Sequence, residues 1–429
     1  MSSQIIQDKH LGEQYIRVEH PSGLTMLLYP MPGFSTTYAM FSTQYGSVDT
    51  CFQAKEGGEQ IRVPEGIAHY LEHKMFESED GDAFDRYAKT GAAANAFTSF
   101  DKTCYLFTCS GKFQESLEIL LDCVTHPYFT KETVEKEQGI IGQEIRMYED
   151  DPNWRVTFNL LDSLYHNNSV KVDIAGTIES IARIDADLLY RCYNAFYNLN
   201  NMVLSIAGNF EIKDVVEACD KILKPAAPVR VSTREVREPD EIRARRVEQT
   251  LEVAAPLFQI GFKGRAKSYR ENILAQVTGE LVCDLIAGES TALYRELYDE
   301  GLINAVFDTE VMAGPNYLVN IFSGESRDPD AVFARLTDGV RALQERGISE
   351  EDFERARRAA YGRYVGIYGN VESMAGMMVL AKLADFGAYE PLDLLGELTL
   401  NDAQAFLREN FDTERCALSV VRGPREARA

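Results

Sequence analysis

The segment HYLEH at residues 69–73 constrains this chain more than any other part of its sequence. An α-helix turns once every 3.6 residues, so His69 and His73 would lie on one helical face and direct ring nitrogens at the same ion. The carboxylate of Glu72 would project beside them, within reach of a water bound to that ion. Apolar residues before the segment and an acidic, glycine-containing run at residues 79–82 after it are typical of a short helix. We therefore expect a metal-binding helix here.

The order His-x-x-Glu-His is the signature of inverted zinc peptidases. Catalytic zinc sites hold the metal with three protein ligands and keep a fourth position for water. The motif therefore predicts a third acidic or histidine ligand elsewhere in the chain. The alternative is a chance match, in which two histidines four residues apart are ordinary core or surface residues. The chain has only six histidines, which makes a chance match uncommon.

Residues 130–151 are rich in glutamate and predict a long helix that begins at Thr130 and ends before Pro152. Glu137 and Glu144 lie seven residues apart, two helical turns along one face, and are candidates for the third ligand. The alternative is an ordinary solvated helix face, since spacing alone does not distinguish one glutamate from another. Four apolar residues of the same segment are expected to pack inward: Val134, Ile140, Ile141 and Ile145.

Four segments, in this order along the chain, resemble the pitrilysin or insulinase family of zinc metallopeptidases, the inverzincins. The family includes the mitochondrial processing peptidases. The resemblance covers essentially the whole chain and corresponds to a half-length bacterial member, similar to the subunits of those processing peptidases. The four segments are GIAHYLEHKMFE (66–77), GAAANAFTSFDKTCY (91–105), EKEQGIIGQEI (135–145) and NMVLSIAGNF (201–210).

The resemblance implies roles for five residues of a metalloendopeptidase. It makes His69, His73 and Glu144 the ligands of Zn2+, Glu72 the general base, and Glu137 an acid that supports the site. Zinc held by two imidazoles and one carboxylate lowers the pKa of its water to about 7 and polarises the scissile carbonyl. Glu72 would take the proton of that water and later protonate the leaving amine.

Residues 92–98, AAANAFT, predict a strand that is followed by a turn and a second strand at residues 103–108. In the family this first strand is an open edge beside the zinc, to which an extended peptide adds through main-chain hydrogen bonds. The resemblance therefore implies that Asn95, Ala96 and Phe97 bind substrate. The alternative is an ordinary hairpin strand that requires small side chains for packing.

Length and patterning predict two domains. The chain has 429 residues, of which 45% are apolar, and is long for a single core. A proline-bearing, charged stretch predicts a linker at residues 229–247 between a zinc-binding domain, 1–228, and a homologous domain without the metal motif, 248–429. Each half begins and ends with a strand-like apolar run. We therefore expect an α+β fold of two tandem α/β-sandwich domains with mixed sheets.

Residues 290–307, STALYRELYDEGLINAVF, depart from the family pattern. Members that act alone or as identical pairs carry an arginine and a later tyrosine here, which hold the substrate carbonyl. In this chain Tyr298 stands at the arginine position and Asn304 at the tyrosine position, although Arg295 would substitute if the alignment shifts by a gap. Some half-length members form heterodimers in which the subunit without zinc supplies both residues. We therefore expect the zinc-bearing subunit of a heterodimer rather than a homodimer.

The expected function is that of a zinc-dependent endopeptidase that cleaves short unfolded peptides inside a chamber formed by two subunits. Two alternatives stay open. One is a non-catalytic scaffold or binding homologue of the same fold. The other is a metallohydrolase that acts on something other than peptides, which the peptide-like edge strand at residues 92–98 disfavours.

The net charge of −23 argues against nucleic acid and against an anionic membrane surface as partners. The sequence shows no basic-then-apolar leader and no apolar span of about twenty residues, so we expect a cytoplasmic protein. The eight cysteines form no CxxC pair and lie in apolar stretches. They are therefore expected to be reduced, buried thiols.

Overall fold

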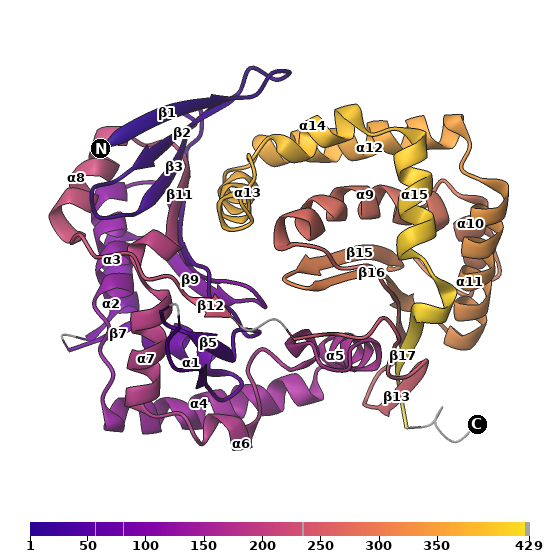
Figure 1. The fold of residues 1–429 in the computed structure, drawn as a ribbon, viewed down its shortest axis with the longest axis horizontal. Helices are drawn as coiled ribbons and strands as arrows, with labels where there is room; N and C mark the ends of the chain where they lie inside the picture. The colour runs from indigo at the N-terminus through magenta and orange to yellow at the C-terminus, as the bar shows by residue number, and fades with distance from the viewer. Residues whose placement is uncertain (56, 80, 234–235, 425–429) are drawn as a thin grey trace. The chain divides into compact units, whose positions relative to one another are not determined.

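The computed structural model describes residues 1–55, 57–79, 81–233 and 236–424, which form two compact units (Figure 1). The first unit comprises Met1–Ile145, Asp173–Arg234 and Gly366–Tyr389, and the second comprises Arg146–Val172, Glu235–Val365 and Glu390–Ala429. Each unit contains a mixed sheet and several helices, which confirms the expected α+β class. The linker at residues 229–247 stays a prediction, and residues 234 and 235 within it lie outside the described residues.

The sheet of the first unit has seven strands in the order β1-β2-β3-β11-β4-β10-β9. Strands β3 and β11 are parallel, and the other neighbours are antiparallel. Every residue of β4 and β11 is buried, as expected for central strands covered on both faces. The bounds are β1 Ser2–Gln7, β2 Gln14–Glu19, β3 Thr25–Pro30, β4 Thr37–Thr43, β9 Ala93–Thr98, β10 Thr103–Cys109 and β11 Met202–Gly208.

The sheet of the second unit has five strands in the order β13-β17-β14-β16-β15. Strands β13 and β17 are parallel and the other neighbours antiparallel, so this order repeats β3-β11-β4-β10-β9 of the first unit. The two units are therefore two versions of one topology, which confirms the expected tandem arrangement. The bounds are β13 Arg246–Thr250, β14 Leu257–Lys263, β15 Asp308–Gly314, β16 Tyr317–Glu325 and β17 Cys416–Arg422.

Small sheets pair β5 Cys51–Gln53 with β6 Ile61–Arg62 and β12 Ser232–Thr233, and β7 Glu77–Ser78 with β8 Gly81–Asp82. Helices of the first unit are α1 Ile67–Lys74, α2 Ala83–Thr90, α3 Phe113–Thr125, α6 Ile178–Ile181, α7 Ala186–Phe196, α8 Ile212–Ile222 and α13 Val371–Leu383. Helices of the second unit are α5 Pro152–Leu164, α9 Tyr269–Ala287, α10 Ala292–Asp299, α11 Pro329–Arg346, α14 Glu390–Glu397 and α15 Leu400–Asn410. Two of the boundaries between the units fall inside helices, one in α4 Lys131–Asp150 and one in α12 Glu350–Tyr368.

Each sheet is covered by a helix from the other half of the sequence (Figure 1). Helix α13 packs on β4 and β11, and the hydroxyl of Ser205 in β11 donates to the carbonyl of Ala375 in α13 at 2.9 Å. Helix α5 packs on β14 and β17. A Cβ atom at Gly261 of β14 would lie 2.8 Å from a methyl group of Leu160 in α5, so a larger residue there would require this side chain to move. The two halves therefore exchange one helix each.

The expected helix at residues 130–151 is confirmed as α4. Val134, Ile141 and Ile145 are buried as predicted, but Ile140 is 47% exposed, so its expected inward packing is wrong. Ile140 precedes Ile141 by one residue and therefore lies about 100° around the helix from it, outside the buried stripe. Seven of the eight cysteines are buried and all are free, as expected. Within the described residues, no helix is long and apolar enough to cross a membrane.

The helix exchange predicts that neither half of the chain is stable alone. A fragment of residues 1–228 lacks α13 and should leave the apolar face of β4 and β11 in water, which favours association with other chains. We expect this fragment to aggregate or to bind the dye ANS, and co-expression with residues 229–429 to restore a soluble complex on size-exclusion chromatography. A monomeric 1–228 fragment that unfolds cooperatively would contradict this expectation.

Candidate metal centre

Helix α1 begins at a glycine in a left-handed backbone conformation that other residues rarely adopt. Gly66 is the N-cap residue and has a φ of 85°, and a Cβ atom there would lie 2.3 Å from the carbonyl oxygen of Ala175. Within α1 the apolar residues Ile67, Tyr70 and Leu71 are buried. This packing fixes the helix in the first unit and so orients the polar residues that it carries.

Two hydrogen bonds tie α1 to the beginning of α4. The hydroxyl of Tyr70 donates to the carbonyl of Val134, and the ammonium group of Lys74 donates to the carbonyl of Thr133 at 3.3 Å. Lys74 is fully buried and also pairs with Glu77. A buried lysine is rare unless it is paired, so these contacts hold the two helices in a defined register. That register decides which glutamates of α4 face the histidines of α1.

The structure brings His69 and His73 of α1 together with Glu144 of α4. The Nε2 atom of His69 lies 3.7 Å from one Glu144 oxygen, and the Nε2 atom of His73 lies 3.3 Å from the other. One ligand atom from each of the three residues falls within 4.8 Å of the others. Within the described residues, this is the one such group of histidine, cysteine, aspartate and glutamate.

The donor set fits a zinc ion. Two ligands at zinc-bond lengths of about 2.0–2.1 Å and a tetrahedral angle are about 3.3 Å apart, close to the observed separations around Glu144. The Nδ1 atom of His69 is buried and has no hydrogen-bond partner in the described part of the chain. The Nε2 atom is the ring nitrogen of His69 that faces Glu144, so it is the atom placed to bind an ion.

Glu137 supports the site from behind His73. The Nδ1 atom of His73 donates to Glu137 at 3.0 Å, so both ring nitrogens of His73 face carboxylates of α4. Burial lowers the pKa of His73, but hydrogen bonds with Glu137 and Glu144 outweigh burial and raise it to about 10. Burial raises the pKa of Glu137, but the hydrogen bond and charge of His73 outweigh that and hold it below its usual range. The surroundings of His73 therefore favour a positive charge.

Glu72 lies on α1 beside the three candidate ligands and is 8% exposed. Burial raises the pKa of its carboxyl, and the opposing effects of His69, Thr98 and His73 leave it above its usual range. The hydroxyl of Thr98 donates to Glu72 Oε2 at 2.8 Å. A carboxylate with a raised pKa beside a set of metal ligands is suited to accept a proton from a water bound to the metal.

The expected substrate residues lie on β9, the last strand of the sheet, which packs beside α1. Within the described residues β9 pairs with β10 on one side and with no strand on the other. Asn95 and Phe97 are exposed and Ala96 is half-buried, since alternate residues of a strand point to opposite faces. Their role in binding substrate stays a prediction.

Thr98 is a site residue that the sequence did not single out. It ends the segment AAANAFT and shares a strand face with Ala96, which turns it towards α1 rather than to the exposed side. The strand alternation was a usable signal for that face. The contact with Glu72 spans 26 residues of sequence, however, and local pattern gives no information on it.

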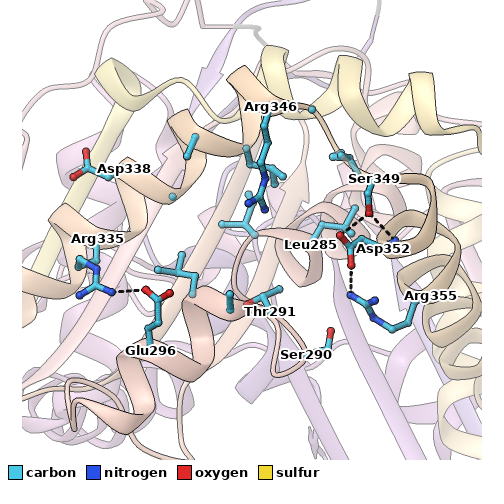
Figure 2. A pocket seen from close by; sticks show the side chains of 18 residues that line it. Leu285, Ser290, Thr291, Glu296, Arg335, Asp338, Arg346, Ser349, Asp352 and Arg355 are labelled. Atoms are coloured by element: carbon cyan, nitrogen blue, oxygen red, sulfur yellow. Dashed lines mark hydrogen bonds and ion pairs between the residues drawn. The ribbon is translucent and has the colours of Figure 1, made fainter.

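A cavity of about 860 Å³ lies in the second unit beside α10, α11 and the start of α12 (Figure 2). Four of its charged side chains form two ion pairs, Arg335 with Glu296 at 2.7 Å and Arg355 with Asp352 at 2.6 Å. None of the residues expected to bind metal or substrate lines it. This cavity therefore has no part in the metal centre.

Two residues stand where the family pattern expects an arginine and a tyrosine that hold the substrate carbonyl, a pair called the clamp below. They lie in and after α10. Tyr298 is 49% exposed and its ring stacks on that of Tyr294, with 6.0 Å between centroids. The side-chain amide of Asn304 donates to Glu325 at 2.8 Å. Arg295 is exposed and lies three residues before Tyr298, so the two side chains point to adjoining parts of the helix surface. Either side chain is available to a ligand of the second unit.

The chain matches two family models, the insulinase or peptidase family M16 over residues 62–178 and the peptidase M16 inactive domain over residues 183–360. A Bacillus subtilis protein named "uncharacterized zinc protease YmfH" is 34% identical over 424 residues, which cover 97% of this chain and 98% of that protein. Another B. subtilis protein, "uncharacterized zinc protease YmxG", is 26% identical over 71% of this chain and 75% of its own length.

Solved structures agree with these matches. An M16-like peptidase from Alicyclobacillus acidocaldarius superposes with a TM-score of 0.91 and 32% identity, over 98% of each chain. Pitrilysin has the same fold, with a TM-score of 0.75 and 15% identity, over 98% of this chain and 46% of pitrilysin. The present chain therefore corresponds to about half of pitrilysin. On its two family models and its full-length relatives, the chain belongs to the insulinase family of peptidases, M16.

Proposed function

We propose that this protein is a zinc-dependent endopeptidase that cleaves short unfolded peptides. The observation that carries the proposal is the convergence of His69, His73 and Glu144 with the buried Glu72 in one part of the first unit. A set of two imidazoles and one carboxylate is a catalytic zinc set, because it leaves a coordination position for water. Full-length relatives named as zinc proteases support the same assignment.

His69, His73 and Glu144 would hold Zn2+, and the bound ion would act as a Lewis acid that lowers the pKa of water and polarises the scissile carbonyl. Glu72 accepts the proton of the attacking water and returns it to the leaving amine. Glu137 accepts the hydrogen bond of His73 Nδ1, which fixes the ring so that Nε2 faces the metal position. Each of the five residues thus has one role in the hydrolysis of an amide bond.

The outer edge of β9 supports an extended peptide as the substrate. An edge strand presents unpaired N–H and C=O groups, to which another strand can add. We assign this contact to Asn95, Ala96 and Phe97, of which Asn95 and Phe97 are exposed. A folded protein cannot offer a free strand at this edge without unfolding locally, so short unfolded peptides are the favoured substrates.

We further propose that the protein is the zinc-bearing subunit of a heterodimer whose partner supplies an arginine and a tyrosine to the substrate carbonyl. Tyr298 stands where the family pattern expects arginine, and Asn304 stands where it expects tyrosine. The amide of Asn304 is engaged with Glu325. The partner subunit would close the peptide chamber, and a homodimer is the less favoured arrangement.

A second candidate function is that of a non-catalytic scaffold or binding protein of the same fold. The family model for residues 183–360 describes an inactive domain, which favours this role for the second unit. The first unit argues otherwise, because a scaffold has no need for a buried Glu72 beside a complete ligand set. Peptidase activity is therefore the proposal to test first.

The substitution Glu72→Gln tests the catalytic role directly. Glutamine keeps the shape of the side chain but cannot accept the proton of water, so we expect turnover of unstructured peptides to fall by about 10²-fold or more. Bound zinc, measured by atomic emission, should stay at the wild-type ratio. Wild-type turnover in the variant would remove Glu72 from this role. A wild-type protein without turnover under any condition, including mixture with homologous subunits, would favour the scaffold.

Zinc binding should release a proton. The pKa of His73 is raised to about 10, so below that pH the metal-free imidazole carries a proton, whereas zinc binds only the neutral ring. The apparent zinc affinity should therefore rise about tenfold per pH unit between roughly pH 6 and pH 8. Calorimetry in buffers of different ionisation enthalpy would count the protons. An affinity that does not change with pH would contradict this, and Glu137→Gln should reduce the proton count.

The origin of the clamp can be tested with Arg295→Ala. If a partner supplies the arginine, the protein alone should be slow and the substitution should leave its turnover unchanged. Loss of an oxyanion donor costs about 10²–10³-fold in kcat, so a loss of that size in the variant would mean that Arg295 itself holds the carbonyl. Arg358→Ala, another exposed arginine of the second unit, is the matched control, because Arg358 lies on α12 and away from the segment of α10.

A further inference from the structure

In the part of the chain that the structure describes, the Glu72 carboxylate accepts one hydrogen bond from outside its own helix. The Thr98 hydroxyl donates to Glu72 Oε2 at 2.8 Å, between the end of β9 and the middle of α1. Glu72 is buried, and a hydrogen bond to a buried carboxylate is stronger than one in water. This contact therefore restricts the rotation of the carboxylate, and the Thr98 hydroxyl engages Oε2 and not Oε1.

The side chain of Thr98, which donates this hydrogen bond, has little rotational freedom. Thr98 is β-branched, so few rotamers of its side chain are populated within a strand. Its backbone pairs with that of Thr103 in β10. The hydroxyl of Thr103 lies 3.4 Å from that of Thr98 but donates to the carbonyl of Tyr45 at 2.9 Å. The Thr103 hydroxyl is thus committed elsewhere, and Thr98 alone of the two threonines reaches Glu72.

We propose that Thr98 is a positioning residue that sets the orientation of the Glu72 carboxylate and links it to the edge strand β9. The inference rests on the proposed peptidase function and adds a residue to it. Thr98 is the last residue of the strand that carries Asn95, Ala96 and Phe97, the residues proposed to bind substrate. A peptide that adds to β9 would pair the free backbone groups of the strand and restrict its motion, which in turn restricts the Thr98 hydroxyl. Both the binding of the peptide and the orientation of Glu72 would therefore depend on β9.

The test compares Thr98→Val, which keeps the shape and removes the hydroxyl, with Thr98→Ser, which keeps the hydroxyl. We expect Thr98→Val to lower kcat by about ten- to hundredfold, the range for loss of one hydrogen bond to a charged group, with KM within about twofold of wild type. Thr98→Ser should recover kcat to within about threefold. Zinc affinity, measured by chelator competition, should be the same in all three proteins.

Thr103→Val is the matched control, because it removes a neighbouring hydroxyl that bonds Tyr45 and leaves the Glu72 contact in place. It should change thermal stability more than kcat. A second readout is the affinity of each zinc-loaded protein for a peptide hydroxamate, whose bound form shares a proton with the base. Thr98→Val should weaken this affinity about tenfold or more, and Thr98→Ser should not.

The proposal for Thr98 is overturned if Thr98→Val matches wild type in kcat and in hydroxamate affinity. It is also overturned if Thr98→Ser fails to rescue, or if Thr98→Val loses zinc, since either result means that Thr98 acts through packing. If the wild-type protein neither turns over peptides nor binds the hydroxamate, the peptidase function itself fails and the role of Thr98 falls with it. The two failures are therefore distinguishable by the behaviour of the wild-type protein.

Discussion

The imidazole of His73 is the contact on which the metal centre depends, because it joins two helices through both of its ring nitrogens. One nitrogen faces Glu137 and the other faces Glu144, and both glutamates belong to α4. A small rotation of α4 relative to α1 would break both contacts at once. Tyr70 and Lys74 prevent that rotation at the beginning of α4, one helical turn or more away from the carboxylates. The chemistry of the site thus relies on helix register rather than on any one ligand.

Helical periodicity was sufficient to predict that His69 and His73 share a face, because their spacing is local. The choice of Glu144 over the other glutamates of α4 needed the family resemblance, since an acidic helix offers many carboxylates at helical spacing. Thr98 was missed because its contact with Glu72 joins a strand to a helix. The predicted inward packing of Ile140 is wrong, because this side chain lies outside the buried stripe of the helix, which contains Ile141.

The strand order was also only partly predictable. Apolar runs at the beginning and end of each half indicated two related units, and the shared order β3-β11-β4-β10-β9 and β13-β17-β14-β16-β15 bears this out. The pattern of α5 is amphipathic and α13 is apolar over most of its length, so both helices are expected to be buried, but neither sequence says which sheet receives the helix. Helix exchange depends on tertiary contacts between distant segments, and the sequence contains no local signal for it.

The two units also differ in the helix that carries the metal motif. In the second unit α9 follows β14 as α1 follows β4 in the first, but α9 has no histidine.

The position of α13 has a consequence for the order in which the protein folds during synthesis. Strands β4 and β11 leave the ribosome early, but the helix that covers their apolar face is residues 371–383 of a 429-residue chain. The first unit therefore stays open on one side until translation is nearly finished, even though the candidate metal ligands have already been synthesised. Nascent chains with an uncovered sheet are substrates for chaperones. The sheet of the first unit can be covered on both faces only when residues 371–383 have been synthesised.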